Sequence, residues 1–323
     1  MTTYTYETID PPGSIYTAAE GINSKGQIVG FYQDSNRIEH GFLYDHGVYT
    51  TIDPPGSGET VANGINSKGQ IFGFYEIGGS GPIVGFLYDQ GTYKTIDPAG
   101  SNRVTPEGIN DAGQVVGVYH DSSGVDHSFL YNHGTYTTID FPGALDTYAL
   151  GINNAGQVVG GYLDSDTIGH VHGFLYDHGT YTTIEPPGSV DTYLTSINNS
   201  GAIVGHNQNG GFEYSHGTYT IIDFPGARYT DPETISDSGI VTGFYQTSGP
   251  NETQHGFVYD HGQYTSIDPP GGTSTSSYFI SNSGQIVGLF SDNTTNHGFL
   301  ATDHPTHDHN TMLVGLHTSD FHF

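Results

Sequence analysis

The chain has 323 residues, of which 34% are hydrophobic and 13% aromatic, enough to build a sizeable core. Six Lys and Arg residues stand against 34 Asp and Glu residues, so the formal net charge is −28. Because nucleic acids and anionic membranes require a cationic surface, this balance argues against both as partners. The absence of Cys excludes disulfides and thiolate chemistry.

The N-terminal segment carries no targeting signal. Residues 1–10 (MTTYTYETID) lack the basic start and the apolar block of a signal peptide, and no apolar run in the chain approaches the ~18 residues of a membrane span. We therefore expect either a protein that stays inside the cell or one whose leader was removed before this numbering begins.

Two signatures repeat along the chain. GINSKGQIVG (21–30) recurs with its Ile at positions 22, 65, 109, 152, 197, 235 and 280, in steps of 43, 44, 43, 45, 38 and 45. HGFLYDHGVYTTIDPPGS (40–57) recurs in near-copies from Val84, His127, His172, Gly210 and His255, and in a truncated copy from His297. Periods of 20–50 residues identify repeat architectures, and seven repeats fill the chain from near residue 4 to near residue 303.

Each repeat is predicted to contain four short strands and no helix, because Ile, Val, Tyr, Phe and Thr dominate it. The strands correspond to stretches such as Val61–Ile65, Gln27–Tyr32, Gly41–Asp45 and Tyr49–Asp53. Between them, Asn23–Gly26 is a turn closed by an Asn side chain, and Gly47 supplies the positive φ of a bulged hairpin.

The segment after the fourth strand, Pro54–Ser57 in the first copy, cannot continue a sheet because Pro lacks an N–H donor. We interpret it as the crossover to the next repeat. The other spacings are constant, so the variation in period falls between the second and third strands, at 14, 15, 14, 16, 9 and 16 residues.

Units of four strands at this period predict an all-β fold, a seven-bladed β-propeller of four-stranded antiparallel blades. The last repeat lacks a fourth strand, whereas the chain begins with one, Tyr4–Asp10. We therefore expect the N-terminal strand to complete the last blade and close the ring. Residues 1–303 form the propeller in this interpretation, and residues 304–323 form a His-rich tail, docked or partly ordered.

The paired motifs HGFLYDHGVYTTID and GINSKGQIVGFY resemble the bacterial extracellular HAF-repeat family, with His-Gly-Phe in place of its His-Ala-Phe. The resemblance covers the whole chain except the tail. It implies a propeller-like repeat protein that is secreted or attached to the cell surface, and it brings no catalytic residues to transfer.

In such a propeller the variable loops and the crossovers emerge on one face, which we expect to bind ligands. The candidates there are two kinds of side chain, Arg for anionic groups and aromatic rings next to the crossovers. They are Arg37, Arg103, Arg228, Tyr148, Tyr193, Tyr229 and Tyr278, together with His206 in the shortened loop of the fifth repeat.

The residue two positions before each repeat Ile should line the upper mouth of the central channel. These residues are Glu20, Asn63, Glu107, Leu150, Thr195 and Glu233. Carboxylate and amide oxygens are ligands for hard cations, so Glu20, Asn63, Glu107 and Glu233 form a candidate Ca²⁺ or Mg²⁺ site. The alternative is that these groups meet backbone donors or channel water.

The 18 His residues are mostly structural in this interpretation. Counting back from the Asp45–Gly47 turn places His40 opposite Asp53, and the same register pairs His127 with Asp140, His172 with Glu185, His255 with Asp268 and His297 with Asp10. Such repeated pairs fasten the third strand to the fourth. The His residues of the turns themselves, such as His46, are expected to be exposed.

No catalytic signature stands out, so the expected function is a binding or scaffold module, as a monomer, with carbohydrate as the first expected ligand. A cation-dependent hydrolase or lyase at the channel mouth is the alternative, and a protein-interaction scaffold is a third. In the tail, His304, His307, Asp308 and His309 are a weak candidate for a transition-metal site.

Overall fold

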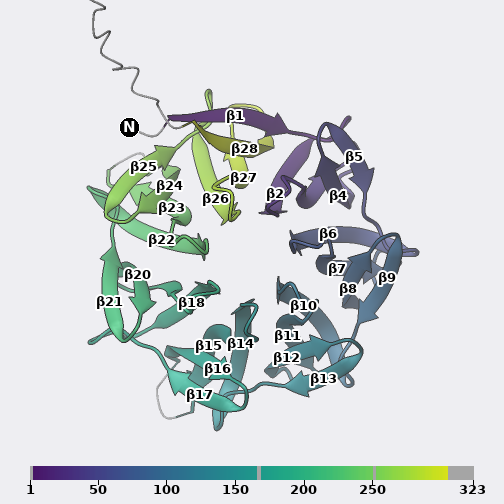
Figure 1. Ribbon diagram of the computed structural model, residues 1–323. Coiled ribbons are helices and arrows are strands. Elements are labelled where there is room, and N and C mark those ends of the chain that lie inside the picture. Colours follow the sequence, from purple (N-terminus) through teal and green to yellow (C-terminus); the bar gives the residue numbers. More distant parts are fainter. Residues whose placement is uncertain (1–2, 166–168, 250–251, 305–323) are drawn as a thin grey trace, which may run out of the picture.

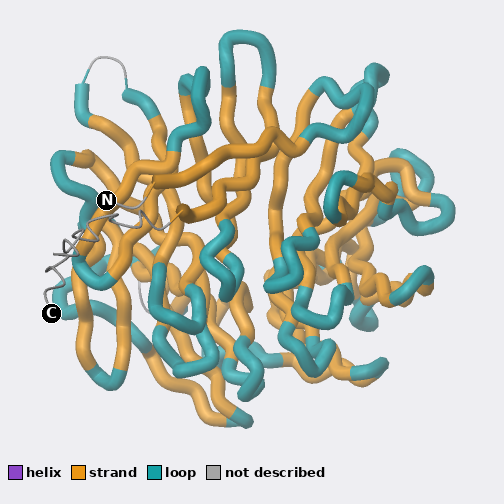
Figure 2. The backbone as a smooth tube through the Cα atoms, turned by 45° about the horizontal axis from the view of Figure 1, so that its top comes forward, coloured by secondary structure: helices purple, strands orange, loops and turns teal. Residues whose placement is uncertain are grey.

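The computed structural model describes residues 3–165, 169–249 and 252–304, and this part of the chain is all-β (Figure 1). It contains 28 strands joined by short loops (Figure 2). None of its elements is a helix long and apolar enough to cross a membrane. Of the predicted His-rich tail, residues 304–323, only His304 is described, and it belongs to the last strand of the sheet rather than to a tail; residues 305–323 lie outside the described residues.

Each sequence repeat corresponds to four strands, referred to below as a unit. The first unit comprises β2 (Tyr16–Ile22), β3 (Ile28–Gln33), β4 (Glu39–Asp45) and β5 (Val48–Thr51). The second comprises β6 (Ser57–Ile65), β7 (Ile71–Ile77), β8 (Ile83–Asp89) and β9 (Thr92–Ile96). The third comprises β10 (Ser101–Ile109), β11 (Val115–Asp121), β12 (Asp126–Asn132) and β13 (Thr135–Thr138).

The remaining units follow the same order. The fourth comprises β14 (Ala144–Ile152), β15 (Val158–Asp164), β16 (Val171–Asp177) and β17 (Thr180–Thr183). The fifth comprises β18 (Thr192–Ile197), β19 (Ile203–Asn207), β20 (Gly210–Ser215) and β21 (Thr218–Ile222). The sixth comprises β22 (Ala227–Ile235), β23 (Val241–Thr247), β24 (Gln254–Asp260) and β25 (Gln263–Ile267). The last comprises β26 (Ser274–Ile280), β27 (Ile286–Ser291), β28 (Asn296–His304) and β1 (Thr3–Ile9).

Within every unit the four strands pair antiparallel, in chain order in the first six units and in the order β26, β27, β28 and β1 in the last. Five units are separate four-stranded sheets, and the second and third are joined into one eight-stranded sheet by a single parallel pairing, Arg103 with Ile83. The units surround a common centre, with the first strand of each innermost and the fourth outermost (Figure 1). Six or more short antiparallel units around an axis are typical of β-propellers.

Strand β1 occupies the place of the fourth strand in the last unit. It pairs antiparallel with β28 over its whole length, from Thr3 opposite His304 to Ile9 opposite Gly298. The phenol oxygen of Tyr6 also accepts a hydrogen bond from the Asp268 backbone N–H, at 3.2 Å, in the preceding unit. The pairing expected for the N-terminal strand is therefore present.

The core lies between neighbouring units. The Phe of the third strand is fully buried in six of them, at positions 42, 86, 129, 174, 257 and 299. One core cluster, for example, joins Val29 and Ile52 of the first unit to Ile71 and Phe86 of the second. Since a single unit cannot bury both faces of its sheet, stacking against its neighbours stabilises it. The predicted inter-unit position of the aromatic side chains is confirmed.

Two local predictions differ from the structure. The innermost strand is longer than predicted: β6 begins at Ser57 rather than Val61, because Ser57 already pairs with Ile77 across an irregular register. The hairpin at Asp45–Val48 is a two-residue turn rather than a bulged one. His46 and Gly47 both have positive φ, 49° and 89°, which suits the right-handed twist of the flanking strands.

The predicted His–carboxylate pairs are all present. His40 Nδ1 lies 2.7 Å from Asp53 Oδ2, and the Gly41 N–H donates to the other oxygen of the same carboxylate at 3.1 Å. The equivalent distances are 2.6 Å for His127–Asp140, 3.0 Å for His255–Asp268 and 2.6 Å for His297–Asp10, and His172 contacts Glu185. The turn residue His46 has a side chain that is 78% exposed, as expected.

Candidate functional site

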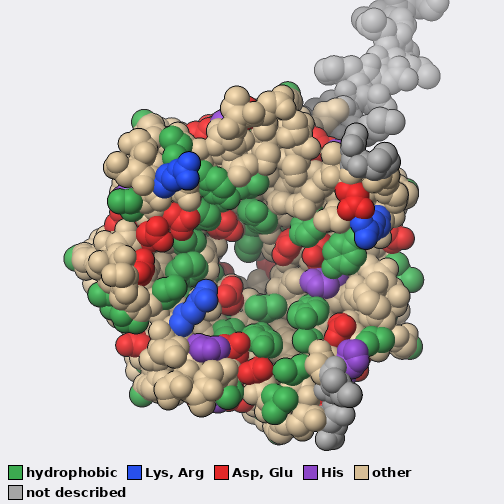
Figure 3. Space-filling view, turned by 180° about the vertical axis from the view of Figure 1, so that it is seen from behind, with side chains coloured by type: hydrophobic (Ala, Val, Ile, Leu, Met, Phe, Trp, Pro, Cys, Tyr) green, Lys and Arg blue, Asp and Glu red, His purple; other side chains and the backbone are tan. Residues whose placement is uncertain are grey.

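The centre of the molecule is a cavity of about 430 Å³. The predicted channel-lining residues all border it, namely Glu20, Asn63, Glu107, Leu150, Thr195 and Glu233, together with Tyr278 from the last unit. Asp and Glu side chains gather around the central opening on the face seen in Figure 3. The six residues expected at the channel therefore do border it.

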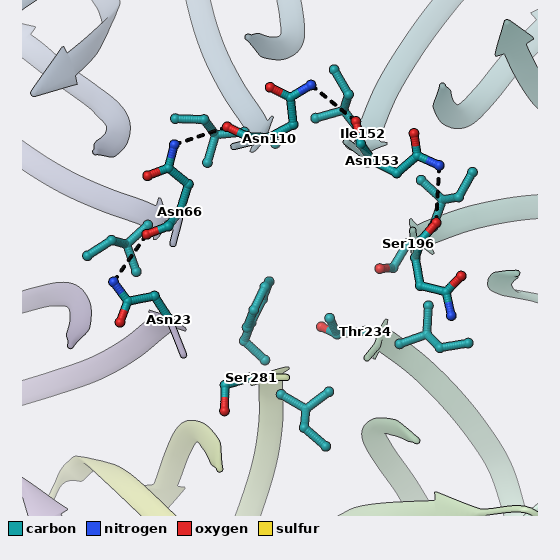
Figure 4. Close-up of a pocket in the computed structure, with 18 of the residues that line it drawn as sticks. Asn23, Asn66, Asn110, Ile152, Asn153, Ser196, Thr234 and Ser281 are labelled. Carbon is teal, nitrogen blue, oxygen red and sulfur yellow. Dashed lines mark hydrogen bonds between the residues drawn. The ribbon is translucent and has the colours of Figure 1, made fainter. Parts of the chain in front are cut away.

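At one end of this cavity, a ring of Asn side chains links successive units (Figure 4). Asn23 Nδ2 donates to the Asn66 backbone carbonyl at 3.1 Å, Asn66 to that of Asn110 at 3.0 Å, and Asn110 to that of Asn153 at 3.1 Å. Asn153 and Asn198 continue the series to the carbonyls of Asn198 and Ser236, at 3.1 and 3.0 Å. We call these five residues the asparagine belt.

Each belt residue uses its whole amide group. Asn23 Oδ1 accepts hydrogen bonds from the N–H groups of Lys25 and Gln27, at 3.0 and 3.1 Å, which closes its own turn. Its Nδ2 then reaches the neighbouring unit, although only 4% of the residue is exposed. The sixth and seventh units carry Ser236 and Ser281 instead. The hydroxyl oxygen of Ser236 accepts from the Ile240 N–H at 3.1 Å, within its own turn.

The opposite end of the cavity is formed by the acidic mouth, Glu20, Glu107 and Glu233. Burial raises the pKa of Glu20 and of Glu107 to about 7, and that of Glu233 to about 8. Charge repulsion from Glu20 adds to the shift of the other two, whereas Thr105 and Arg103 lower the pKa of Glu107. The Glu107 side chain is open to the channel, but the protein atoms packed around it limit the hydration of its carboxyl group, which favours the protonated form. These carboxyl groups therefore exchange protons near neutral pH.

The predicted cation ligands are only partly suited to that role. Among the described residues, no three His, Asp or Glu side chains lie close enough together to hold a metal ion. Asn63 Nδ2 donates to the Pro106 backbone carbonyl at 3.0 Å and so fastens the wall of the channel. The mouth is thus an acidic rim without a ready coordination shell in this part of the chain.

A second cavity, of about 360 Å³, opens between the third and fourth units. We call it the side cavity. Glu107 and Leu150 line both the side cavity and the central one, so the two adjoin at the mouth. Its further polar lining consists of Arg103, Thr105, His120, Asp126 and Tyr148.

The polar groups of the side cavity are held in place from several elements. His120 Nδ1 lies 2.5 Å from Asp126 Oδ1, which joins β11 to β12. The Asp126 N–H donates to Asp146 Oδ1 of the next unit at 2.9 Å. Burial, followed by the charges of Asp146 and Asp126, raises the pKa of Tyr148 to about 12, so the phenol stays protonated. Among the ion pairs of the described residues, none includes Arg103.

Three further candidates meet between the fifth and sixth units. Tyr193 stacks on His206 with ring centroids 5.2 Å apart, and Tyr229 contacts His206 edge-on at 6.1 Å. His206 Nδ1 lies 2.6 Å from Asp231 Oδ1, across the interface. The five-residue loop predicted for this unit is a tight hairpin, in which Asn207 pairs with Gly210.

The three Arg candidates do not form one site. Arg103 lines the side cavity with Tyr148, whereas Arg228 Nη1 is paired with Glu252, and Arg37 lies in an exposed turn with a φ of 66°. Sequence analysis missed His120 and Asp126. Counting from the repeat Ile could have found His120, since no other unit has His at that position.

No protein-family model matches the sequence, and no curated protein matches it. Several solved structures are similar in fold. A structure of prolyl endopeptidases matches with a TM-score of 0.63 and 12% identity, covering 90% of this chain and 49% of that one. The β-propeller domain of the Trilobed protease from Pyrococcus furiosus, described as having an open velcro topology, matches with 0.61 and 10%, covering 94% and 99%.

A puromycin-hydrolyzing peptidase from Mycobacterium tuberculosis matches with a TM-score of 0.58 and 10% identity, covering 88% of this chain and 52% of that one. At such low identities the similarity establishes the fold alone: four-stranded antiparallel units in a propeller-type arrangement. The ligand of this protein must therefore be inferred from the residues of its own cavities.

Proposed function

We propose that this protein is a non-catalytic binding scaffold that holds a carbohydrate in the side cavity at its acidic mouth. The side cavity is the observation that carries the proposal, because it combines an apolar wall with several fixed polar groups. A concave site of that composition is what small-molecule recognition generally uses.

The lining matches the surface of a sugar ring, which presents hydroxyl groups at its edge and C–H groups on its faces. Arg103 and His120 offer N–H donors, and Glu107 and Asp126 offer carboxylate acceptors. The ring of Tyr148 offers an aromatic surface for the C–H groups. Because the His120–Asp126 pair is already formed, little ordering entropy is lost on binding.

The site is specific to one pair of units. At the position of Arg103 the other units carry Tyr16, Glu59, Asp146, Asp191, Tyr229 and Ser274. At the position of His120 they carry Gln33, Glu76, Leu163, Gln208, Gln246 and Ser291. One binding site per chain is therefore expected.

Titration calorimetry of glycans selected on a glycan array tests this function. The Tyr148→Ala variant should bind the selected glycan about tenfold more weakly, a loss of about 1.4 kcal/mol. Tyr193→Ala is the matched control, because Tyr193 occupies the same repeat position outside the side cavity, and its affinity should stay within twofold. The proposal fails if no glycan binds, or if the two variants lose affinity equally.

An enzyme remains the second candidate, on one observation: the pKa of about 7 at Glu107, next to the side cavity. A carboxyl group with a pKa near the operating pH suits general acid–base catalysis in a hydrolase or lyase. Turnover of the bound glycan, abolished by Glu107→Gln while binding persists, would establish this alternative. Binding without product in a reducing-end assay would reject it.

The wider architecture belongs to the same proposal. The strand pairing of β1 with β28 and the propeller-type neighbours support a seven-bladed ring closed by the N-terminal strand. The resemblance to HAF repeats supports a secreted or surface-attached protein. Fractionation of the native host into cell, surface and medium would test the location.

A further inference from the structure

Arg103 is unusual in its surroundings. The protein has only six Lys and Arg residues against 34 Asp and Glu residues, yet Arg103 belongs to none of the ion pairs found in the described residues. It is also the one Lys or Arg residue among the described residues that line either cavity. Such an unpaired guanidinium in a cavity is available to a ligand.

Glu107 does not form a close ion pair with this guanidinium. The charge of Arg103 lowers the pKa of Glu107, but burial outweighs it and leaves that pKa at about 7, well above the ordinary 4.5. The ion pairs of the described residues include none between Arg103 and Glu107, although both line the side cavity. The cavity therefore contains a free planar fork of N–H donors, the geometry that binds a carboxylate through two parallel hydrogen bonds.

The other side of the cavity is suited to uncharged hydroxyl groups. His120 Nδ1 is held by Asp126, so its Nε2 is left for a ligand. Tyr148 supplies a phenol, and Val118 and Leu150 supply apolar surface. A ligand that fills this cavity thus presents one anionic group at Arg103 and hydroxyl groups at the His120–Asp126 pair.

Resting on the proposed carbohydrate function, we infer that the side cavity binds an acidic sugar, a pyranose ring whose carboxylate lies on Arg103. A neutral sugar offers the guanidinium only hydroxyl acceptors, which bind it more weakly than a carboxylate does. A phosphate group carries close to two negative charges and would meet Glu107 and Asp126 with only one cation to offset them. One carboxylate per ring matches one Arg.

The test compares methyl uronides of the gluco, galacto and manno series with their methyl esters and neutral methyl glycosides, by calorimetry and ligand-observed NMR at 0.15 M salt. The wild-type protein should bind one uronide at least tenfold more tightly than its ester and its neutral counterpart. Arg103→Gln should reduce that ratio to within twofold, mainly by weakening the binding of the uronide, because the Gln amide can still donate a hydrogen bond to a hydroxyl group. Arg103→Lys keeps the charge but not the planar guanidinium. Its ratio of uronide to neutral-glycoside affinity should therefore lie between those of the wild-type protein and Arg103→Gln.

Arg228→Gln is the matched control, since it removes the same charge from a residue already paired with Glu252, outside both cavities. Its preference for the uronide should equal that of the wild-type protein. The melting temperature of each variant shows that the fold is intact, which is expected because Arg103 and Arg228 are exposed at the surface.

A second readout is the effect of pH. Since Glu107 loses its proton around pH 7, it repels the bound carboxylate increasingly between pH 6 and pH 8. Affinity for the uronide should therefore fall several-fold over this range in the wild-type protein and stay level in Glu107→Gln. A level profile in both proteins would contradict the placement of the carboxylate near Glu107 and overturn the inference.

The outcomes separate the inference from the function it rests on. If the wild-type protein binds a neutral glycoside as tightly as the uronide, the acidic-sugar inference fails and carbohydrate binding stands. If inorganic phosphate binds more tightly than every uronide, the cavity is a phosphate site and the inference fails. If none of the saccharides binds, both fail.

Discussion

The two ends of the central cavity use polar groups in opposite ways. At the asparagine belt, the nitrogen and the oxygen of each side-chain amide both form hydrogen bonds with backbone groups. For Asn66 these bonds are 2.9–3.1 Å long, and the residue is buried. At the acidic mouth, Glu20, Glu107 and Glu233 border the cavity, and burial raises their pKa values to about 7 to 8. One end holds the units together, and the other keeps groups available for a ligand.

This contrast shows where a repeat protein can vary. The belt position is Asn in five units, whereas the mouth position two residues before the repeat Ile changes from Glu to Asn, Leu, Thr and Tyr. A satisfied buried amide is costly to replace, since its partners would lose their hydrogen bonds. At the mouth position Asn63 and Thr195 donate to the backbone of the neighbouring unit, at 3.0 and 2.8 Å, whereas within the described residues the three Glu side chains form no hydrogen bond of this kind, so this position can differ from unit to unit.

The largest effect is expected from removing a strand that belongs to neither end. Deletion of residues 1–10 removes β1, exposes the edge of β28 and uncovers the fully buried Ile9 site. The free energy of unfolding should fall by about 5 kcal/mol or more. Chemical denaturation measures the loss, and adding a peptide of residues 1–10 should restore part of it. Unchanged stability would show that this strand does not complete the last unit.

The belt itself is tested by Asn110→Ala. This change removes the donor to the Asn153 carbonyl and the acceptor for the Ala112 and Gln114 N–H groups. The free energy of unfolding should decrease by about 3 kcal/mol, while ligand affinity stays the same below the transition. Ser236→Ala is the control, because Ser236 keeps its hydroxyl within its own turn, and it should cost about 1 kcal/mol. Equal losses in the two variants would remove the special role of the amide.

The mouth is tested by Glu233→Gln, which should stabilise the protein at high pH. The folded protein holds the Glu233 proton up to about pH 8, whereas an ordinary Glu loses it near 4.5. Between these two pH values the folded protein keeps a proton that the unfolded chain releases. The free energy of unfolding therefore falls progressively as the pH rises from 4.5 to 8. At pH 9 the variant should be more stable by about 1–2 kcal/mol, and at pH 4 it should equal the wild-type protein.

Denaturation curves at several pH values measure this difference. A gain at pH 4 as large as that at pH 9 would mean that packing, rather than ionisation, separates the two proteins. Thr195→Ser is a neutral control at the same repeat position, and its effect should not depend on pH.

The smallest effect is expected at a His–carboxylate pair. Burial lowers the pKa of His127, but its hydrogen bonds with Asp140 and Asp121 outweigh burial and raise it overall. The pair therefore contributes most below the ordinary pKa of 6.5, and its contribution is lost as the pH rises through the raised value. His127→Val, which copies Val84 of the second unit, should cost about 1 kcal/mol at pH 5.5 and less at pH 9. Thermal melts at both pH values measure it, and a larger loss at pH 9 would contradict this assignment.

Sequence alone predicted the features that depend on local geometry. A short hairpin fixes its own register, so the position of Gly47 was enough to place His40 opposite Asp53. The innermost strand of each unit lines the channel, so the constant spacing from the repeat Ile was enough to place Glu20, Glu107 and Glu233 there, although each lies at an irregularity of the strand register. Both inferences needed only distances within one unit.

Most of the missed features depend on contacts between segments that are distant in the sequence, and several of these segments lie in neighbouring units. Asn23 was assigned to its turn, and its second bond, to the Asn66 carbonyl, depends on how closely two sheets approach. The pairs His206–Asp231 and Arg228–Glu252 join segments 25 and 24 residues apart, whose juxtaposition no strand period determines. For the same reason, the side cavity between Arg103 and Tyr148 was not expected as a cavity.

The belt also bears on how such a chain can be assembled over time. Each Asn donates to a backbone carbonyl, a group that every neighbour possesses whatever its side chain: Asn198 reaches the carbonyl of Ser236 as readily as Asn66 reaches that of Asn110. A unit copied by duplication therefore fits beside any other unit without a matching substitution. Recombination can exchange units while each keeps its own mouth residue. New ligand sites can therefore arise without compensating substitutions at the contacts between units.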